Sequence, residues 1–143
     1  MKKVIRELIP ASMEAIEAVF FSEKYKDKAY KTNGIPATFN GYIASFGAST
    51  IQMGLLPTIV VFSDKSSSSK ENKALLLEVL WQVLQHEKSG FDNSKGKGDL
   101  LKTALDLSTK NNIHQLKQPL QRASIAIKLA LRTYKLDPNA KDD

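Results

Sequence analysis

Basic side chains are the groups in this sequence whose number and placement could do chemistry. The 143-residue chain has a formal net charge of +6 at pH 7, and between Lys88 and Lys135 ten lysines or arginines accompany only three aspartates. Such asymmetry is typical of a protein that binds a polyanion such as a nucleic acid. It is equally typical of a solvated lysine-rich surface, so charge alone leaves both interpretations open.

The basic residues form two groups with recognisable spacing. One, the lysine–tyrosine cluster, interleaves lysines with Tyr25 and Tyr30, a composition found where aromatic rings stack on bases beside phosphate contacts. The other, the C-terminal basic strip, follows one side of the last expected helix. The lysine–tyrosine cluster contains Lys24, Lys26, Lys28 and Lys31, and the C-terminal basic strip contains Lys117, Lys128, Arg132 and Lys135. Taken alone, each group is also compatible with a solvated surface.

Side chains that could catalyse a reaction or bind a metal are few. The chain has no cysteine, which excludes disulfides, thiolate metal sites and a cysteine nucleophile. Its two histidines, His86 and His114, have no ligand-like spacing, and Gly90 stands where a zinc helix motif would place its second histidine. We therefore expect no enzyme activity, no metal, no cofactor and no small-molecule substrate. A small hydrolase would need ionisable groups that only the fold brings together.

The loop from Gly90 to Gly98 has a partial likeness to a phosphate-binding loop. Its glycine spacing is one residue too long, and Gly98 replaces the Ser or Thr that would bind a metal. No strand signal precedes it. Lys95, Lys97 and the backbone N–H groups of the loop could still hold RNA phosphates, whereas a solvated mobile loop is the simpler interpretation.

Apolar residues recur at helical spacing nearly throughout, so the sequence predicts an all-α fold, a compact single-domain bundle of about six helices. In the first helix the expected buried stripe is Ile5, Ile9, Met13, Ile16 and Phe20. The further expected helices cover residues 36–53, 56–62, 70–88, 100–108 and 113–136, with Gly54 as a helix stop and Asp99 as a helix cap. Of these, 59–62 would also suit a lone strand, and Pro119 bends the last helix or marks its true start.

We expect residues 1–136 to form the helical domain and residues 137–143, with three aspartates and one lysine, to form an acidic flexible tail. The longest apolar run, Leu55 to Phe62, is far shorter than the ~20 residues that span a bilayer. Arg6 and Glu7 interrupt the apolar core that a signal peptide needs. The sequence therefore predicts a cytoplasmic protein that does not contact membranes.

Two helices favour contact with another protein. The last helix has a second apolar face, with Ile125, Leu129 and Leu136, opposite its core-facing residues. The segment Ala74–Leu84 is so apolar that its helix is either central or also faces a partner. These two helices support an alternative interpretation, in which the chain is a protein-interaction module without direct RNA contact. Separately, the face formed by Gly41, Ala44, Ser45 and Ala48 is small enough for a neighbouring helix to approach closely.

The segment from Gly34 to Phe62 combines three features in a fixed order. Ile35-Pro36 opens a helix, Gln52 precedes Gly54-Leu55 near its end, and an apolar segment follows. This combination resembles the small-subunit family of Cmr (CRISPR type III-B) complexes. The similarity extends over 11–84 and more loosely over the C-terminal basic helix, where 127–135 lacks the aromatic residues expected of the family.

The resemblance implies a non-catalytic helical subunit that serves antiviral defence. Several copies would line the body of the ribonucleoprotein and contact the guide–target duplex through basic surfaces. The implied partners are guide RNA, target RNA and other Cmr subunits, including copies of the chain itself. We expect RNA backbone contacts first from the C-terminal basic strip and second from the lysine–tyrosine cluster.

Overall fold

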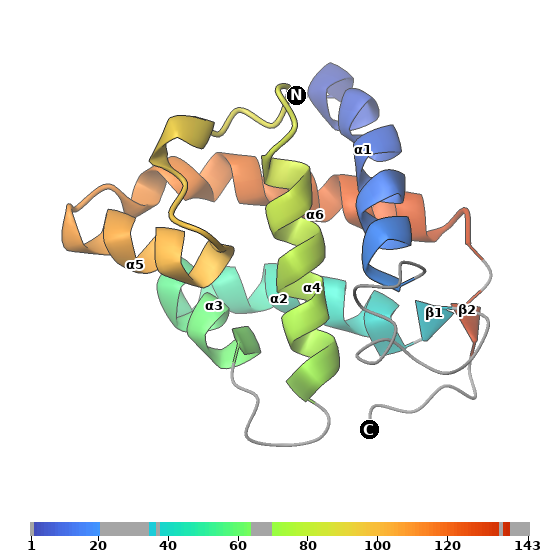
Figure 1. Ribbon diagram of the computed structural model, residues 1–143. Helices are drawn as coiled ribbons and strands as arrows, with labels where there is room; N and C mark the ends of the chain where they lie inside the picture. The colour runs from blue at the N-terminus through green and yellow to red at the C-terminus, as the bar shows by residue number, and fades with distance from the viewer. Residues whose placement is uncertain (1, 21–34, 37, 64–69, 135, 138–143) are drawn as a thin grey trace.

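The computed structural model describes residues 2–20, 35–36, 38–63, 70–134 and 136–137. Within these residues six α-helices pack as one body, which confirms the predicted all-α bundle (Figure 1). The α-helices are α1 (Lys2–Phe20), α2 (Thr38–Met53), α3 (Leu55–Ser63), α4 (Lys70–Leu84), α5 (Leu100–Thr109) and α6 (Lys117–Leu131). The short elements are the 3-10 helices η2 (Asn93–Lys95) and η3 (Ile113–Leu116) and the two-residue strands β1 (Ile35–Pro36) and β2 (Leu136–Asp137).

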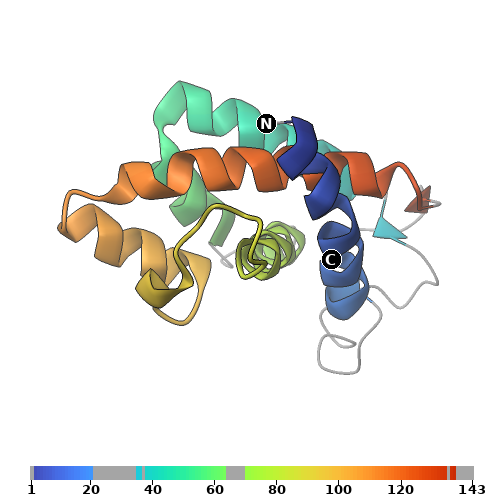
Figure 2. The same cartoon turned by 90° about the horizontal axis from the view of Figure 1, so that it is seen from above.

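Helix α6 lies at the centre of the bundle and contacts α1, α2, α4 and η3. Figure 2 looks along α4 while α6 runs across the view, so the two helices cross. The side of α6 that faces the bundle contains three alanines that are fully buried, Ala123, Ala126 and Ala130. Small side chains on this face let the neighbouring helices approach α6 closely.

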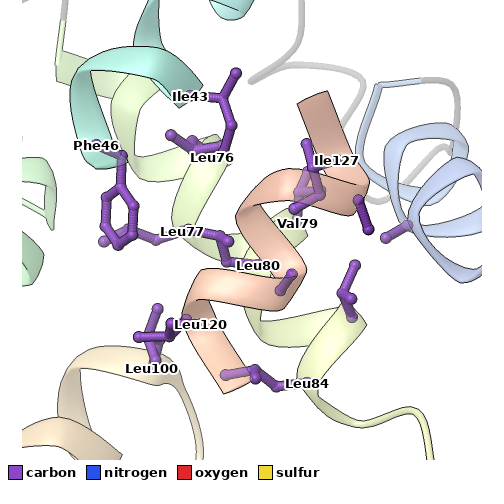
Figure 3. Packing of buried hydrophobic residues seen from close by; sticks show 14 of the residues in the cluster. Ile43, Phe46, Leu76, Leu77, Val79, Leu80, Leu84, Leu100, Leu120 and Ile127 are labelled. Atoms are coloured by element: carbon purple, nitrogen blue, oxygen red, sulfur yellow. The ribbon is translucent and has the colours of Figure 1, made fainter. Parts of the chain in front are cut away.

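The core is built around α4, whose leucines and valines are buried on almost every side. Figure 3 shows Leu76, Leu80 and Leu84 of this helix meeting Ile43 and Phe46 of α2, Leu100 of α5, and Leu120 and Ile127 of α6. The unusually apolar composition of α4 therefore reflects a central position in the bundle.

The buried face of α1 differs from the predicted stripe. Ile16 and Phe20 are buried as predicted, while Ile5, Ile9 and Met13 pack against the edge of the core. The remaining buried positions are Leu8, Ser12, Ala15 and Val19, which the predicted stripe did not include. A serine can occupy the buried face because the Ser12 hydroxyl donates a hydrogen bond of 2.8 Å to the Leu8 carbonyl. Pro10 lies on the exposed side of α1, where water can satisfy the carbonyl that its missing N–H leaves unpaired.

Two predicted helices end earlier than expected. Helix α4 stops at Leu84 instead of Lys88, because the Ser89 side chain caps the Leu84 carbonyl at 2.8 Å and turns the chain. Helix α6 stops at Leu131 instead of Leu136, because Leu136 and Asp137 are extended and pair in parallel with Ile35 and Pro36. Asp137, the first residue of the expected acidic tail, therefore lies in β2, and residues 138–143 fall outside the described residues.

Other boundaries follow the sequence signals. Gly54 adopts a left-handed backbone (φ 91°) between α2 and α3, which confirms that it ends the first of these helices. The apolar segment that follows is a helix and not a strand. Pro119 is the third residue of α6, within the first turn, so it marks the true start of this helix after η3. Asp99 caps α5 by accepting a hydrogen bond of 2.8 Å from the backbone N–H of Lys102.

Candidate nucleic-acid interface

The C-terminal basic strip lies on the outer face of α6. Lys117 and Lys128 are exposed and separated by about three helical turns, and Arg132 is exposed at the C-cap. At 1.5 Å per residue the three side chains extend over about 22 Å of the helix axis. Lys135 falls outside the described residues, and so do Lys24, Lys26, Lys28 and Lys31 of the lysine–tyrosine cluster. The strip residues that the structure describes are therefore brought to one surface.

The stretch of chain that carries the strip contains no acidic residue. No aspartate or glutamate occurs between Lys110 and Leu136. Among the described residues an ion pair joins Lys110 to Asp106 at 3.1 Å, and none involves the strip. Lys117, Lys128 and Arg132 are therefore available to solvent or to a polyanion.

A second basic group, which sequence spacing did not bring together, lines a cleft beside the start of α6. The cleft has a volume of about 520 Å³ and lies between residues 90–95 and the segment formed by η3 and the first turns of α6. Its cationic lining residues are Lys95, Lys117 and Arg122. In Figure 1 the yellow-to-gold segment that leaves the end of α4 passes the start of α6 before it enters α5.

Hydrogen bonds within the protein engage two of the cleft's three cationic side chains, and only partly. The Lys95 ammonium donates to Oε1 of Gln115 at 2.8 Å. Nη2 of Arg122 donates to Oε1 of Gln118 at 3.3 Å, and Nε of Arg122 is buried without a hydrogen-bond partner among the described residues. The lack of acidic residues near Arg122 in the sequence was a signal for this site. That signal could not locate the cleft, because the opposite wall comes from a segment about thirty residues earlier in the chain.

The segment opposite α6 is anchored to the body of the protein. The Asn93 side chain donates to the Gln85 carbonyl at 3.0 Å, and the backbone N–H of Lys97 donates to the Thr103 hydroxyl at 2.8 Å. Phe91 is buried against Trp81, with ring centroids 6.2 Å apart. These contacts hold the segment against the body of the protein, while Asn93, Ser94 and Lys97 remain exposed to solvent.

The one acidic residue at the cleft, Asp92, is already engaged. Its Oδ1 accepts hydrogen bonds from the Ser94 hydroxyl at 2.6 Å and from the Ser94 backbone N–H at 3.0 Å. These bonds, together with the nearby Lys95 charge, lower the pKa of the Asp92 carboxyl below its ordinary value. Asp92 therefore stays ionised at neutral pH, and one of its oxygens serves the turn.

The histidines form no metal site. His86 and His114 belong to separate segments, and Nδ1 of His86 accepts a hydrogen bond of 3.1 Å from the Lys88 backbone N–H. No group of three or more metal-ligating side chains occurs in the described parts of the chain. Across the same residues, no helix has the length and apolar composition needed to cross a bilayer.

An exposed face of α2 consists mainly of small and apolar side chains. Gly41, Ala44, Ser45 and Ala48 are exposed, so no described helix of this chain packs on the small face as the sequence suggested. A side chain added at Gly41 would meet no atom within 4 Å. Ile51 continues this row at helical spacing and is 88% exposed. We call these five residues the α2 outer face.

Comparison with protein-family models gives one match. Residues 13–129, which run from the middle of α1 nearly to the end of α6, match the model described as CRISPR-associated protein (Cas_Cmr5). No curated protein and no solved structure matches the chain.

Proposed function

Because this chain belongs to the Cas_Cmr5 family, the small subunit of the Cmr (type III-B) CRISPR complex, we propose that its C-terminal basic strip binds the backbone of the guide–target RNA. The family assignment expected from the segment 34–62 is confirmed. Membership makes the chain a subunit of the type III-B complex, in a family whose role is structural and non-catalytic. The contact with RNA is the step we add.

The observation that supports this proposal is the row of unneutralised cations on α6. Lys117, Lys128 and Arg132 are exposed on one side of α6 and form no ion pair with a described residue. Contacts of this kind bind phosphates and release counterions without reading sequence. A subunit that must accept any guide sequence needs that type of contact. We propose Lys135 as a further member and the lysine–tyrosine cluster, Lys24 to Lys31, as a second contact.

The test replaces two strip residues that lie away from the cleft. A Lys128→Ala/Arg132→Ala variant should bind two guide–target duplexes of unrelated sequence more weakly, and by the same factor for both. The matched control is Lys88→Ala/Lys102→Ala, which removes the same charge from exposed positions outside the strip and outside the cleft lining. A strip variant that binds like the wild type, or that loses affinity for one sequence only, contradicts the proposal.

A second contact, with another protein subunit, is favoured by the α2 outer face. Ile51 is 88% exposed beside small side chains, a combination that is unfavourable in water and suited to a packed interface. We propose that the α2 outer face contacts another subunit of the complex, either a different protein or a further copy of this chain. The Ile51→Asp variant should stay folded but have a lower occupancy in the reconstituted complex. The control Leu105→Asp, at an exposed leucine on α5, should keep the wild-type occupancy.

A further inference from the structure

The cleft beside the start of α6 is concave and gathers cations from separate segments, and RNA backbone contacts along the C-terminal basic strip require neither property. Three cationic side chains from different places in the chain converge on it: Lys95 from η2, Lys117 from the first turn of α6, and Arg122 from its second turn. The strip is a row on an open helix face, whereas the cleft is a concave site. Convergent cations in a concavity are typical of a site for one compact anion.

Arg122 is the residue that most needs such a partner. Its guanidinium makes one long hydrogen bond, of 3.3 Å, and its Nε is the only buried side-chain nitrogen or oxygen without a partner in the described part of the chain. No ion pair with a described residue neutralises it. A partly buried guanidinium without a counter-charge costs free energy, and a bound anion would recover it.

Gly90 makes room for this guanidinium. A Cβ atom at position 90 would lie 2.7 Å from Nη1 of Arg122, closer than carbon and nitrogen atoms can approach. The backbone of Gly90 also has φ 87°, which residues other than glycine rarely adopt. The chain therefore places Arg122 against a residue without a side chain, at the edge of the cleft.

The cleft is preformed and of suitable size. Its volume of about 520 Å³ falls within the range of small-ligand sites and would admit a nucleotide. The hydrogen bonds of Asn93 and Lys97 and the burial of Phe91 fix the opposite wall. Binding would therefore not have to order this segment, which lowers its entropic cost.

Charge selects the kind of anion. Lys95, Lys117 and Arg122 against Asp92 leave a net charge of about +2 in the cleft, which matches a phosphomonoester of charge about −2 at neutral pH. An internal RNA phosphodiester carries about one negative charge. The forked N–H groups of Arg122 suit phosphate oxygens, and lysine ammonium groups add point charges.

We propose that this cleft binds the phosphomonoester of a nucleotide, carried either by a free mononucleotide or by the end of an RNA strand. Arg122 and Lys95 hold the phosphate, and Lys117 joins the cleft to the strip. The site is separate from the proposed backbone contact of Lys128 and Arg132, so either proposal can fail without the other.

The first experiment titrates the full-length chain with adenosine 5′-monophosphate, inorganic phosphate and adenosine, followed by calorimetry. The nucleotide should bind and adenosine should not. Loss of a charge-assisted hydrogen bond in Arg122→Met should weaken nucleotide binding by about ten- to a hundredfold. Lys95→Met should weaken it as well, and it tests the site even if Arg122→Met does not fold. The Lys128→Ala/Arg132→Ala variant should bind the nucleotide as the wild type does.

A second experiment identifies the source of the phosphate. If an RNA oligomer with a 5′-phosphate or a 3′-phosphate binds more tightly than the same oligomer with hydroxyl ends, and Arg122→Met removes the difference, the source is a strand end. If oligomers with and without phosphates bind alike while the nucleotide still binds in the cleft, the source is a free nucleotide.

Three results overturn the inference. One is the absence of binding by both nucleotide and inorganic phosphate at millimolar concentration. Another is nucleotide binding that neither Arg122→Met nor Lys95→Met weakens. The third is binding of a glutamate-rich peptide in the cleft without binding of the nucleotide, which would identify a carboxylate partner in place of a phosphate.

Discussion

The salt dependence of RNA binding gives the sharpest quantitative test of the C-terminal basic strip. Each phosphate contact adds about 0.7 to the slope of log affinity against log salt for single-stranded RNA. Replacement of Lys128 and Arg132 by alanine removes two exposed cations that form no ion pair with a described residue. The slope should therefore become shallower by about 1.4. Between 50 and 200 mM salt this difference corresponds to about a sevenfold change in relative affinity, with the larger defect at low salt.

The assay is fluorescence anisotropy with a labelled single-stranded RNA at four or more salt concentrations, on wild type, strip variant and the Lys88→Ala/Lys102→Ala control. The control has the same net charge as the strip variant, so it should keep the wild-type slope if the contacts are local. An equal loss of slope in both variants would show a general charge effect and refute the assignment to the strip. A strip variant with the wild-type slope would refute it as well. Circular dichroism at 222 nm checks that all three proteins keep their helices.

Two further predictions concern the parts of the fold that position α6. The Tyr134 hydroxyl lies 3.0 Å from Oε1 of Glu17, and burial together with this carboxylate raises its pKa from 10.0 to about 12. The folded state therefore holds the phenol proton more tightly than the unfolded state does. The free energy of unfolding should be unaffected below pH 10 and should fall as the pH rises toward 12. Urea unfolding should show a smaller decline in Tyr134→Phe. Asp99→Ala removes the side-chain cap of α5 and should lower the free energy of unfolding by about 1 kcal/mol, measured by urea unfolding, whereas Asp99→Asn should retain most of it.

The sequence predicted the parts of this fold that local chemistry controls. A glycine that must adopt positive φ ended α2 at Gly54, and a proline without a donor marked the start of α6 at Pro119. Asp99 began α5 because its carboxylate caps the first turn. In each case the signal and the structure it controls lie within four residues of one another.

Features that depend on distant contacts were not predictable in the same way. The buried face of α1 includes Ser12, whose hydroxyl is satisfied within the helix, so the apolar pattern found only part of that face. The early end of α6 depends on the pairing of Leu136 with Ile35, a hundred residues away in the chain. The cleft likewise joins Gly90 and Lys95 to Arg122, and nothing in their spacing predicts that they meet.

The C-terminal basic strip lies on a helix whose opposite face is buried in the core. Whether RNA binding depends on the packing of that helix can be tested without changing any charge. Ala126 is fully buried on the side of α6 that faces the bundle, and Lys128 and Arg132 are exposed on the other side. Ala126→Leu adds volume to a packed interior and should destabilise the protein by about 1–3 kcal/mol, seen as a lower midpoint in urea. If α6 carries its cations as a rigid unit, the folded fraction should keep the wild-type salt slope, because the spacing along the helix is unchanged. A shallower slope at full helicity would instead mean that the RNA contacts depend on how α6 sits against its neighbours, and that the strip alone does not define the interface.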